Sequence, residues 1–269
     1  MTGAILPRPE FRTGRAIVHF ATREVRKPHS NVLVGLVMET LQAIALIGAF
    51  WVLFMLMGMG GGAIRGDFLL YTMTGVFLFL VHTKAVSAVV ACEGAASPML
   101  RHHSVTAHVL LAACALGSLY KQLVALGVIL SVCHLAITPI EIHAPAMALA
   151  ALGLAWLSGC GIGLVLLAGK PWAPSTTMLA ATVYARISMI ASGKMFVANT
   201  LPSSVLVLFD WNPLFHTIDQ ARGHVFVNYA PQNSNLVFAV LVSAVVLLLG
   251  LAFEYLSRKR YSQSRRPKF

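Results

Sequence analysis

Six long apolar runs, each bounded by glycine, proline or charged residues, constrain this chain more than any other feature. A helix needs about 20 mostly apolar residues to cross the roughly 30 Å of hydrocarbon in a bilayer. We therefore predict an all-α integral membrane protein with six transmembrane helices. The predicted spans are residues 32–57, 68–91, 106–137, 145–169, 175–195 and 236–256.

Composition agrees with this class, because 58% of the 269 residues are hydrophobic and only 11% are charged. A soluble globular chain is about a quarter charged. The first apolar run starts at Val32 and no small-residue cleavage site closes it, so we expect a retained helix and not a cleaved signal peptide. We interpret the scattered cysteines as small core residues and not as disulfide partners or metal ligands: Cys92, Cys114, Cys133 and Cys160.

Lysine and arginine set the expected orientation. Six of them precede the first run and six follow the last, so the positive-inside rule places both termini in the cytoplasm. This topology accounts for the excess of 20 Lys+Arg over 9 Asp+Glu, so no nucleic-acid partner is needed to explain the basic charge. The expected domains are a cytoplasmic N-terminal segment (1–31), a transmembrane domain (32–256) and a basic cytoplasmic tail (257–269).

Charges recur at helical spacing in the N-terminal segment, from Phe11 to Lys27, with apolar side chains on another face. This pattern predicts an amphipathic helix on the cytoplasmic membrane surface. Its function stays open between a topology anchor and an interface helix that meets a cytosolic partner or the headgroup of a lipid-linked substrate. The basic residues of this face include Arg12, Arg15, Arg23 and Arg26.

The segment between Met195 and Asn235 is too long for a turn and too broken for a span. Asn212 suits a helix N-cap, Pro213 suits the first helical position, and Gly223 suits a left-handed stop. We predict a re-entrant hairpin of two short helices on the outer side, with Trp211 at the interface. Such a hairpin at that depth points to a gate. The second helix carries an apolar stripe of Leu214, Ile218 and Ala221.

Insertion of a charged residue into the hydrocarbon costs about 2.5 to 3.5 kcal/mol of free energy on insertion scales. Charged residues inside spans therefore usually have a partner or reach water. Glu39 and Lys84 each lie about seven residues from the inner end of a span, so we predict that they pair. Lys194 is expected to extend to the membrane interface. For Lys121 and Arg186 we find no acid at the same depth. They line a hydrated path for an anionic substrate or are purely structural.

No catalytic constellation is recognisable. His102, His103 and His108 match no standard metal spacing. The stretch from Gly163 to Pro171 departs from a nucleotide-binding loop in its glycine spacing and in its final residue. We therefore expect a protein that is not an enzyme, with no catalytic residue, metal or cofactor of its own.

Several short motifs occur together and in order: Arg23-Glu-Val-Arg26, Glu93 followed by Arg101, Cys160-Gly-Ile-Gly163-Leu, and Trp211-Asn-Pro-Leu-Phe-His216 with Arg222 and Tyr229 behind it. In these motifs the chain resembles the ABC-2 type permeases that export capsular polysaccharide and related surface glycans from Gram-negative bacteria. The likeness covers about residues 17 to 255. One departure is Glu39-Thr40, where several members have Glu-Pro.

The resemblance implies a homodimer in the bacterial inner membrane, joined by two copies of a cytosolic ABC ATPase that carries ATP and Mg. It also implies a channel for an anionic lipid-linked glycan, and it is compatible with a periplasmic co-polymerase and an outer-membrane export channel. The residues that would contact the ATPase are Glu93, Arg101 and His102. The periplasmic gate would comprise Trp211, Asn212, Pro213, Phe215, His216 and Arg222.

Three alternatives stay open. The first is a gradient-driven transporter or lipid flippase that works without an ATPase. The second is an ABC-2 exporter of a small lipid or drug. The third is a membrane scaffold that transports nothing.

Overall fold

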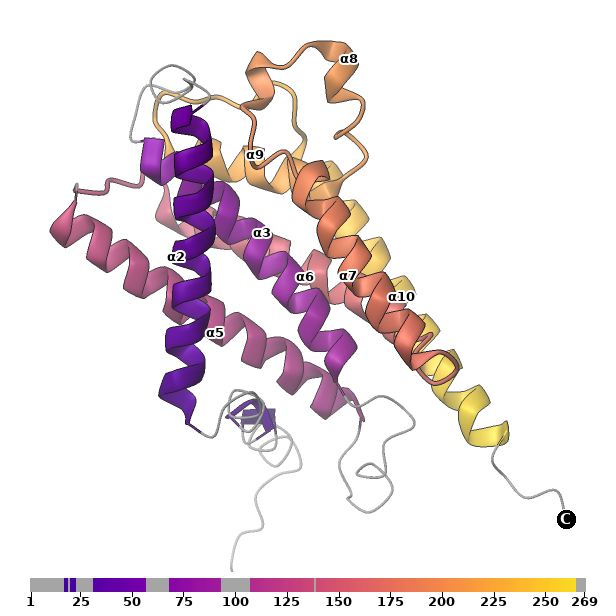
Figure 1. The fold of residues 1–269 in the computed structure, drawn as a ribbon. Coiled ribbons are helices and arrows are strands. Elements are labelled where there is room, and N and C mark those ends of the chain that lie inside the picture. Colours follow the sequence, from indigo (N-terminus) through magenta and orange to yellow (C-terminus); the bar gives the residue numbers. More distant parts are fainter. Residues whose placement is uncertain are drawn as a thin grey trace, which may run out of the picture.

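A computed structural model describes residues 17–18, 20–22, 31–56, 68–92, 107–137 and 139–264, and these residues form helices and turns with no strand (Figure 1). The predicted all-α class is confirmed for this part of the chain. The long helices are α2 (Val32–Leu56), α3 (Phe68–Ala91), α5 (Ala107–Ala136), α6 (Pro145–Leu167), α7 (Pro174–Ala191) and α10 (Leu236–Ser264). Between α7 and α10 lie η1 (Ala198–Thr200), α8 (Ser203–Leu206) and α9 (Pro213–Val225).

Five of these helices are long and apolar enough to cross a membrane: α2, α3, α5, α6 and α10. The chain therefore has the character of a multi-pass membrane protein. α7 coincides with the predicted fifth span but is not among the five. Its 18 residues are long enough, but Arg186 together with several serines and threonines lowers its hydropathy.

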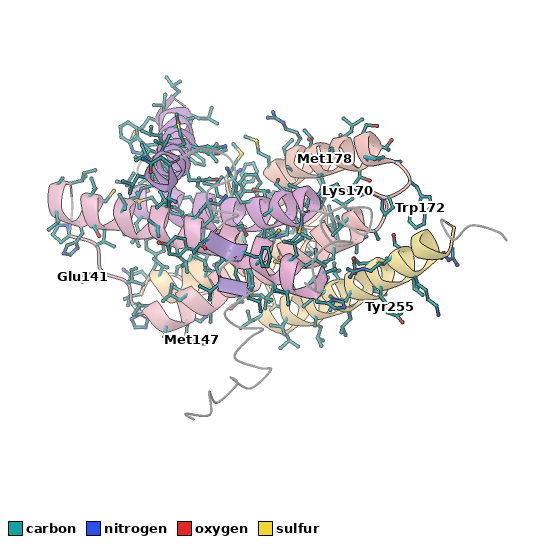
Figure 2. All side chains as sticks on the ribbon, turned by 90° about the horizontal axis from the view of Figure 1, so that it is seen from below. Glu141, Met147, Lys170, Trp172, Met178 and Tyr255 are labelled. Atoms are coloured by element: carbon teal, nitrogen blue, oxygen red, sulfur yellow. The ribbon has the colours of Figure 1, made fainter. Side chains whose placement is uncertain are left out.

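The C-terminal end of α6 packs against the end of α3 and the distal half of α10. Lys170 donates to the carbonyl oxygen of Cys92 (2.8 Å), and Ser257 donates to that of Ala168 (2.7 Å). α7 begins directly after this junction. Figure 2 places the labelled residues Lys170, Trp172 and Tyr255 at this side of the molecule. Trp172 and Tyr255 are exposed.

The opposite end is built from the start of α6, the end of α7 and α9. The backbone N–H of Ala144 donates to His224 O (2.8 Å), and the amide of Asn212 donates to Ala191 O (2.8 Å). Glu141, next to this junction, lies at the other end of the molecule from Lys170 in Figure 2. α7 thus runs between the same two ends as α6.

Glycines on α6 bring the helices into close contact. A Cβ at Gly159 would lie 2.4 Å from the carbonyl oxygen of His82 on α3, and one at Gly161 would lie 2.9 Å from the backbone N of Leu247 on α10. Small residues at helix interfaces in membranes allow such backbone approach. The Cys160-Gly-Ile-Gly163 segment is therefore a packing element between α3 and α10. α3 is the central helix, with most of its residues buried.

Two groups of predicted residues lie outside the described residues. They are the basic residues assigned to the N-terminal interface helix (Arg12, Arg15, Arg23 and Arg26) and the predicted docking residues (Glu93, Arg101 and His102).

Candidate functional site

A cluster of charged and amide side chains lies where α2, α3 and α5 meet. Lys84 Nζ lies 2.8 Å from Glu39 Oε2, in agreement with the pairing predicted from their depth. The same amine donates to Gln42 Oε1 at 2.6 Å. The carboxylate also accepts a hydrogen bond from the amide of Gln122 on α5, at 3.1 Å. This carboxylate therefore joins three helices.

Lys121 belongs to the same cluster, because its Nζ lies 3.9 Å from Glu39 Oε1. The expectation that no acid shares its depth is wrong. α5 has 30 residues, about 45 Å at 1.5 Å per residue, so its ends do not mark the two surfaces of a bilayer about 30 Å thick. Counting residues from those ends misplaces Lys121 relative to Glu39.

The cluster carries an excess of positive charge. Two ammonium groups, Lys84 and Lys121, stand against the single carboxylate of Glu39, which leaves one net positive charge. The three side chains retain 26%, 15% and 16% of their exposure, respectively. A partly exposed positive charge at this depth attracts an anion or hydrated groups.

Arg186 does not join this cluster. It lies on the exposed side of α7, whereas the buried side of that helix carries Thr177, Ala181 and Ser188. It forms no ion pair with any described residue. The two predicted path residues therefore occupy different surfaces.

The α9 helix begins as the sequence predicts. Asn212 Oδ1 accepts from the backbone N–H of Leu214 at 3.0 Å, and Pro213 occupies the first turn. The predicted stop at Gly223 is wrong, since α9 continues to Val225 and Gly223 is not in the left-handed region. Gly223 instead allows a close approach, because a Cβ there would lie 2.6 Å from Pro231 Cδ.

The predicted apolar stripe of α9 is fully buried: Leu214, Ile218 and Ala221. These residues pack with α3 residues such as Met73 and Phe77 in the main core. Phe215 stacks on Phe209, with ring centroids 5.8 Å apart. Trp211 is exposed, and its indole N–H donates to Leu208 O at 2.7 Å. α9 is therefore a packed element, and Trp211 lies at its edge.

His216 joins three segments. Its Nδ1 accepts from the backbone N–H of Asn235 (3.1 Å), so the proton is on Nε2, which donates to Asp210 O (2.8 Å). Its ring also meets that of Phe238 at the start of α10, with centroids 4.7 Å apart. The ring therefore fixes α9 between the preceding turn and the last long helix.

Arg222 is a buried cation, 1% exposed, that connects α9 to the chain after α7. Its guanidinium donates to Lys194 O (2.6 Å) and Phe196 O (2.7 Å). The Tyr71 ring on α3 lies 4.1 Å from the guanidinium carbon. These contacts compensate the burial of the charge.

Asp219 lies one turn before Arg222 and accepts a hydrogen bond from the hydroxyl of Tyr229. Burial, together with the hydrogen bond to this carboxylate, raises the pKa of Tyr229 above its ordinary value. Tyr229 therefore stays a neutral donor. A carboxylate, a guanidinium and a tyrosine thus hold α9 in place without a direct Asp–Arg ion pair.

Lys194 is buried, contrary to the expectation that it extends to the interface. It is 3% exposed, and its Nζ lies 3.2 Å from the centroid of the Phe79 ring and 4.8 Å from that of Phe50. The turn at Gly193, with φ of 62°, directs the chain back over α3. The amine of Lys194 therefore contacts the faces of two aromatic rings.

His82 is a functional-site candidate that sequence reasoning missed. It is 1% exposed on α3, and its Nδ1 lies 2.9 Å from Ser158 Oγ on α6 while its Nε2 lies 2.8 Å from Tyr184 OH on α7. A single histidine in an apolar run gives no sign of its partners. This hydrogen-bond chain connects α7 to the bundle.

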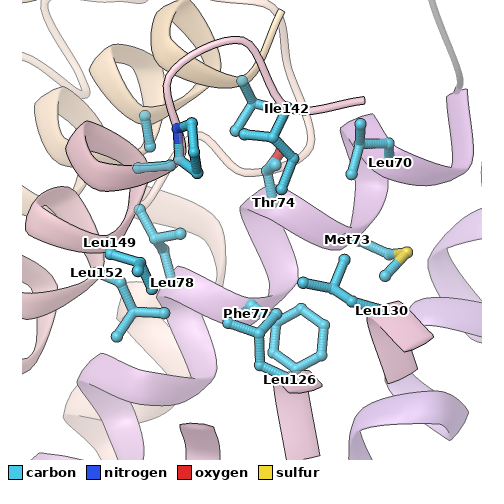
Figure 3. A pocket seen from close by; sticks show the side chains of 14 residues that line it. Leu70, Met73, Thr74, Phe77, Leu78, Leu126, Leu130, Ile142, Leu149 and Leu152 are labelled. Atoms are coloured by element: carbon cyan, nitrogen blue, oxygen red, sulfur yellow. The ribbon is translucent and has the colours of Figure 1, made fainter. Parts of the chain in front are cut away.

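Two apolar cavities flank α5 on its distal half. The cavity of about 210 Å³ lies between α3, α5, α6 and α9 and is lined by residues such as Phe77, Leu126 and Leu149 (Figure 3). The other, of about 310 Å³, lies between α2, α3 and α5. The lining of both is almost entirely apolar, so hydrocarbon fits them better than a sugar does.

A scan against models of protein families finds no match for this chain, and no curated protein matches it.

Proposed function

We propose that this chain is the permease subunit of an ATP-driven exporter that moves a lipid-linked surface glycan across the bacterial inner membrane. Two copies would form the channel, and two copies of a cytosolic ABC ATPase would supply the energy. A periplasmic co-polymerase and an outer-membrane channel are compatible partners. We infer the family from the resemblance in the sequence motifs, and one structural observation supports the proposal.

That observation is the position and attachment of α9. This 13-residue helix follows α7 and packs against α3, α6 and α10. Arg222 attaches it to the chain after α7, and Asp219 attaches it to Tyr229 in the α9–α10 connection. His216 bonds both to that connection and to the turn before α9. A short helix that is packed across one end of a bundle suits a gate in its closed state. We assign this role to α9 with Trp211 at its edge.

The proposal requires α7 to cross the membrane as well, as the fifth of six spans. Its 18 residues rise about 27 Å at 1.5 Å each, close to the thickness of the hydrocarbon core. His82 and Tyr184 connect it to the bundle. Six spans place both basic termini in the cytoplasm. Arg186 then lies on a face that a second copy or the channel would cover.

Co-purification tests the proposal. The tagged chain, isolated from its own membranes, should carry a Walker-motif ATPase, and Glu93→Lys or Arg101→Glu should reduce the amount recovered. Glu141→Lys is the matched control, because Glu141 lies at the other end of the molecule from Lys170, which donates to Cys92 O. The proposal is wrong if no ATPase associates and if transport continues after ATP depletion.

The apolar cavities favour a second candidate, an exporter of the same superfamily that moves a small lipid or drug. Deletion of the gene separates the two functions. A glycan exporter predicts loss of surface glycan with drug tolerance unchanged, whereas the second candidate predicts the reverse.

A further inference from the structure

The charge cluster of α2, α3 and α5 has unused hydrogen-bonding capacity. Lys84 is satisfied by Glu39 and Gln42. Lys121, in contrast, has no hydrogen-bond partner among the described residues, and Glu39 Oε1 at 3.9 Å is too far for one. A lysine ammonium has three donors, so the cluster presents donors that no described acceptor meets.

A second polar atom nearby also lacks a partner. Gln122 is 2% exposed, and its Oε1 forms no hydrogen bond with the described residues, although its Nε2 donates to Glu39. An unmet buried amide oxygen costs about 1 to 3 kcal/mol. The cluster is therefore incomplete on both its donor and its acceptor side.

The depth of the cluster limits what can complete it. Glu39 lies seven residues after Val32 and Lys84 lies seven before Ala91, which corresponds to about 10 Å from each helix end. The neighbouring surface of α2 is apolar, with Met38 and Leu41 about half exposed. A ligand here must carry an anionic group and tolerate a hydrocarbon environment.

We propose that this cluster binds the phosphate of an anionic phospholipid, with Lys121 as the main donor. The net charge of the cluster is positive by one, and a phosphate diester supplies one negative charge. A zwitterionic headgroup would bring its own cation and leave the excess uncompensated. Hydroxyl groups on the headgroup would meet Gln122 Oε1. This lipid site does not depend on the proposed export function.

Lipid retention by the purified full chain tests this proposal. Native mass spectrometry after exchange into phosphatidylglycerol or phosphatidylcholine should show one tightly held phosphatidylglycerol per chain. We expect Lys121→Gln to weaken this binding at least about tenfold, since hydrogen bonds to charged groups are among the strongest. Arg186→Gln is the matched control, because it removes a cation from another helix and should leave binding unchanged.

The Glu39→Gln variant should change lipid binding in the opposite direction. It removes the competing carboxylate, so phosphatidylglycerol should bind more tightly, whereas a purely structural role for Glu39 predicts no increase. Equal retention of the two lipids by the unmodified chain would overturn the proposal, whatever the variants do. Displacement of the lipid by millimolar inorganic phosphate would also overturn it, because the site would then take free phosphate. None of these readouts requires the ATPase or transport.

Discussion

The Glu39 carboxylate and the Lys84 ammonium lie 2.8 Å apart across the α2–α3 interface. The second carboxylate oxygen lies 3.9 Å from Lys121 on α5. The pair is thus part of a three-helix arrangement in which one acid serves two cations. Removal of the acid leaves Lys84 with Gln42 alone and Lys121 with no ion-pair partner among the described residues, and an uncompensated charge costs about 2.5 to 3.5 kcal/mol at the centre of a bilayer.

Charge reversal tests this arrangement. Glu39→Lys and Lys84→Glu should each reduce the amount of folded protein in the membrane, measured by fluorescence-detected size exclusion of a tagged chain. The double reversal should restore it only in part, because the new cation at position 39 lies beside Lys121. Adding Lys121→Gln to the double variant should complete the rescue. A failure of both combinations to rescue would contradict a charge-based role.

The glycines of α6 give a second test. Gly159→Ala places a methyl group 2.4 Å from the His82 carbonyl oxygen, so the α3–α6 contact must open, at a cost of about 1 to 3 kcal/mol. Gly153→Ala on the same helix meets nothing within 4 Å and should stabilise by up to about 1 kcal/mol through helix propensity. Melting temperatures in detergent should therefore shift in opposite directions. Equal shifts would exclude close packing at Gly159.

The positions of the long helices could be predicted from the sequence because hydropathy is a local property. α3 begins and ends at the predicted residues 68 and 91. The start of α9 was also predictable, since Asn212 and Pro213 act on their own backbone. The end of α10 was less predictable, because its helical backbone continues past the apolar run to Ser264.

The partners of polar residues could not be predicted in the same way, because they depend on how helices cross. His82 meets Ser158 where Gly159 lets α6 approach α3 closely, and it meets Tyr184 because α7 packs beside α3. Lys194 follows the left-handed turn at Gly193 and is buried against the rings of Phe79 and Phe50. Neither relationship is visible in spacing along one helix.

Arg222 should be the most important single side chain for the attachment of α9. Arg222→Met removes the donors of two buried carbonyl groups, those of Lys194 and Phe196, and should cost at least about 2 kcal/mol. Trp211→Ala, at an exposed residue, should stay within about 1 kcal/mol. Unfolding in detergent with increasing denaturant measures both. Similar losses would mean that α9 is not held by Arg222.

The thiols of Cys92 and Cys114 test the contact between the end of α3 and the first half of α5. Their sulfur atoms lie 2.7 Å apart and both side chains are buried. Mild oxidation of membranes with copper phenanthroline should remove two electrons and two protons from this pair and form one disulfide. Peptide mass spectrometry should find the disulfide between Cys92 and Cys114.

Cys133 and Cys160 belong to two different core clusters, so they should remain unlinked to each other. A Cys92→Ser variant should abolish the link, and a link between Cys133 and Cys160 in the unmodified chain would contradict the packing of α5 against α3 and α6.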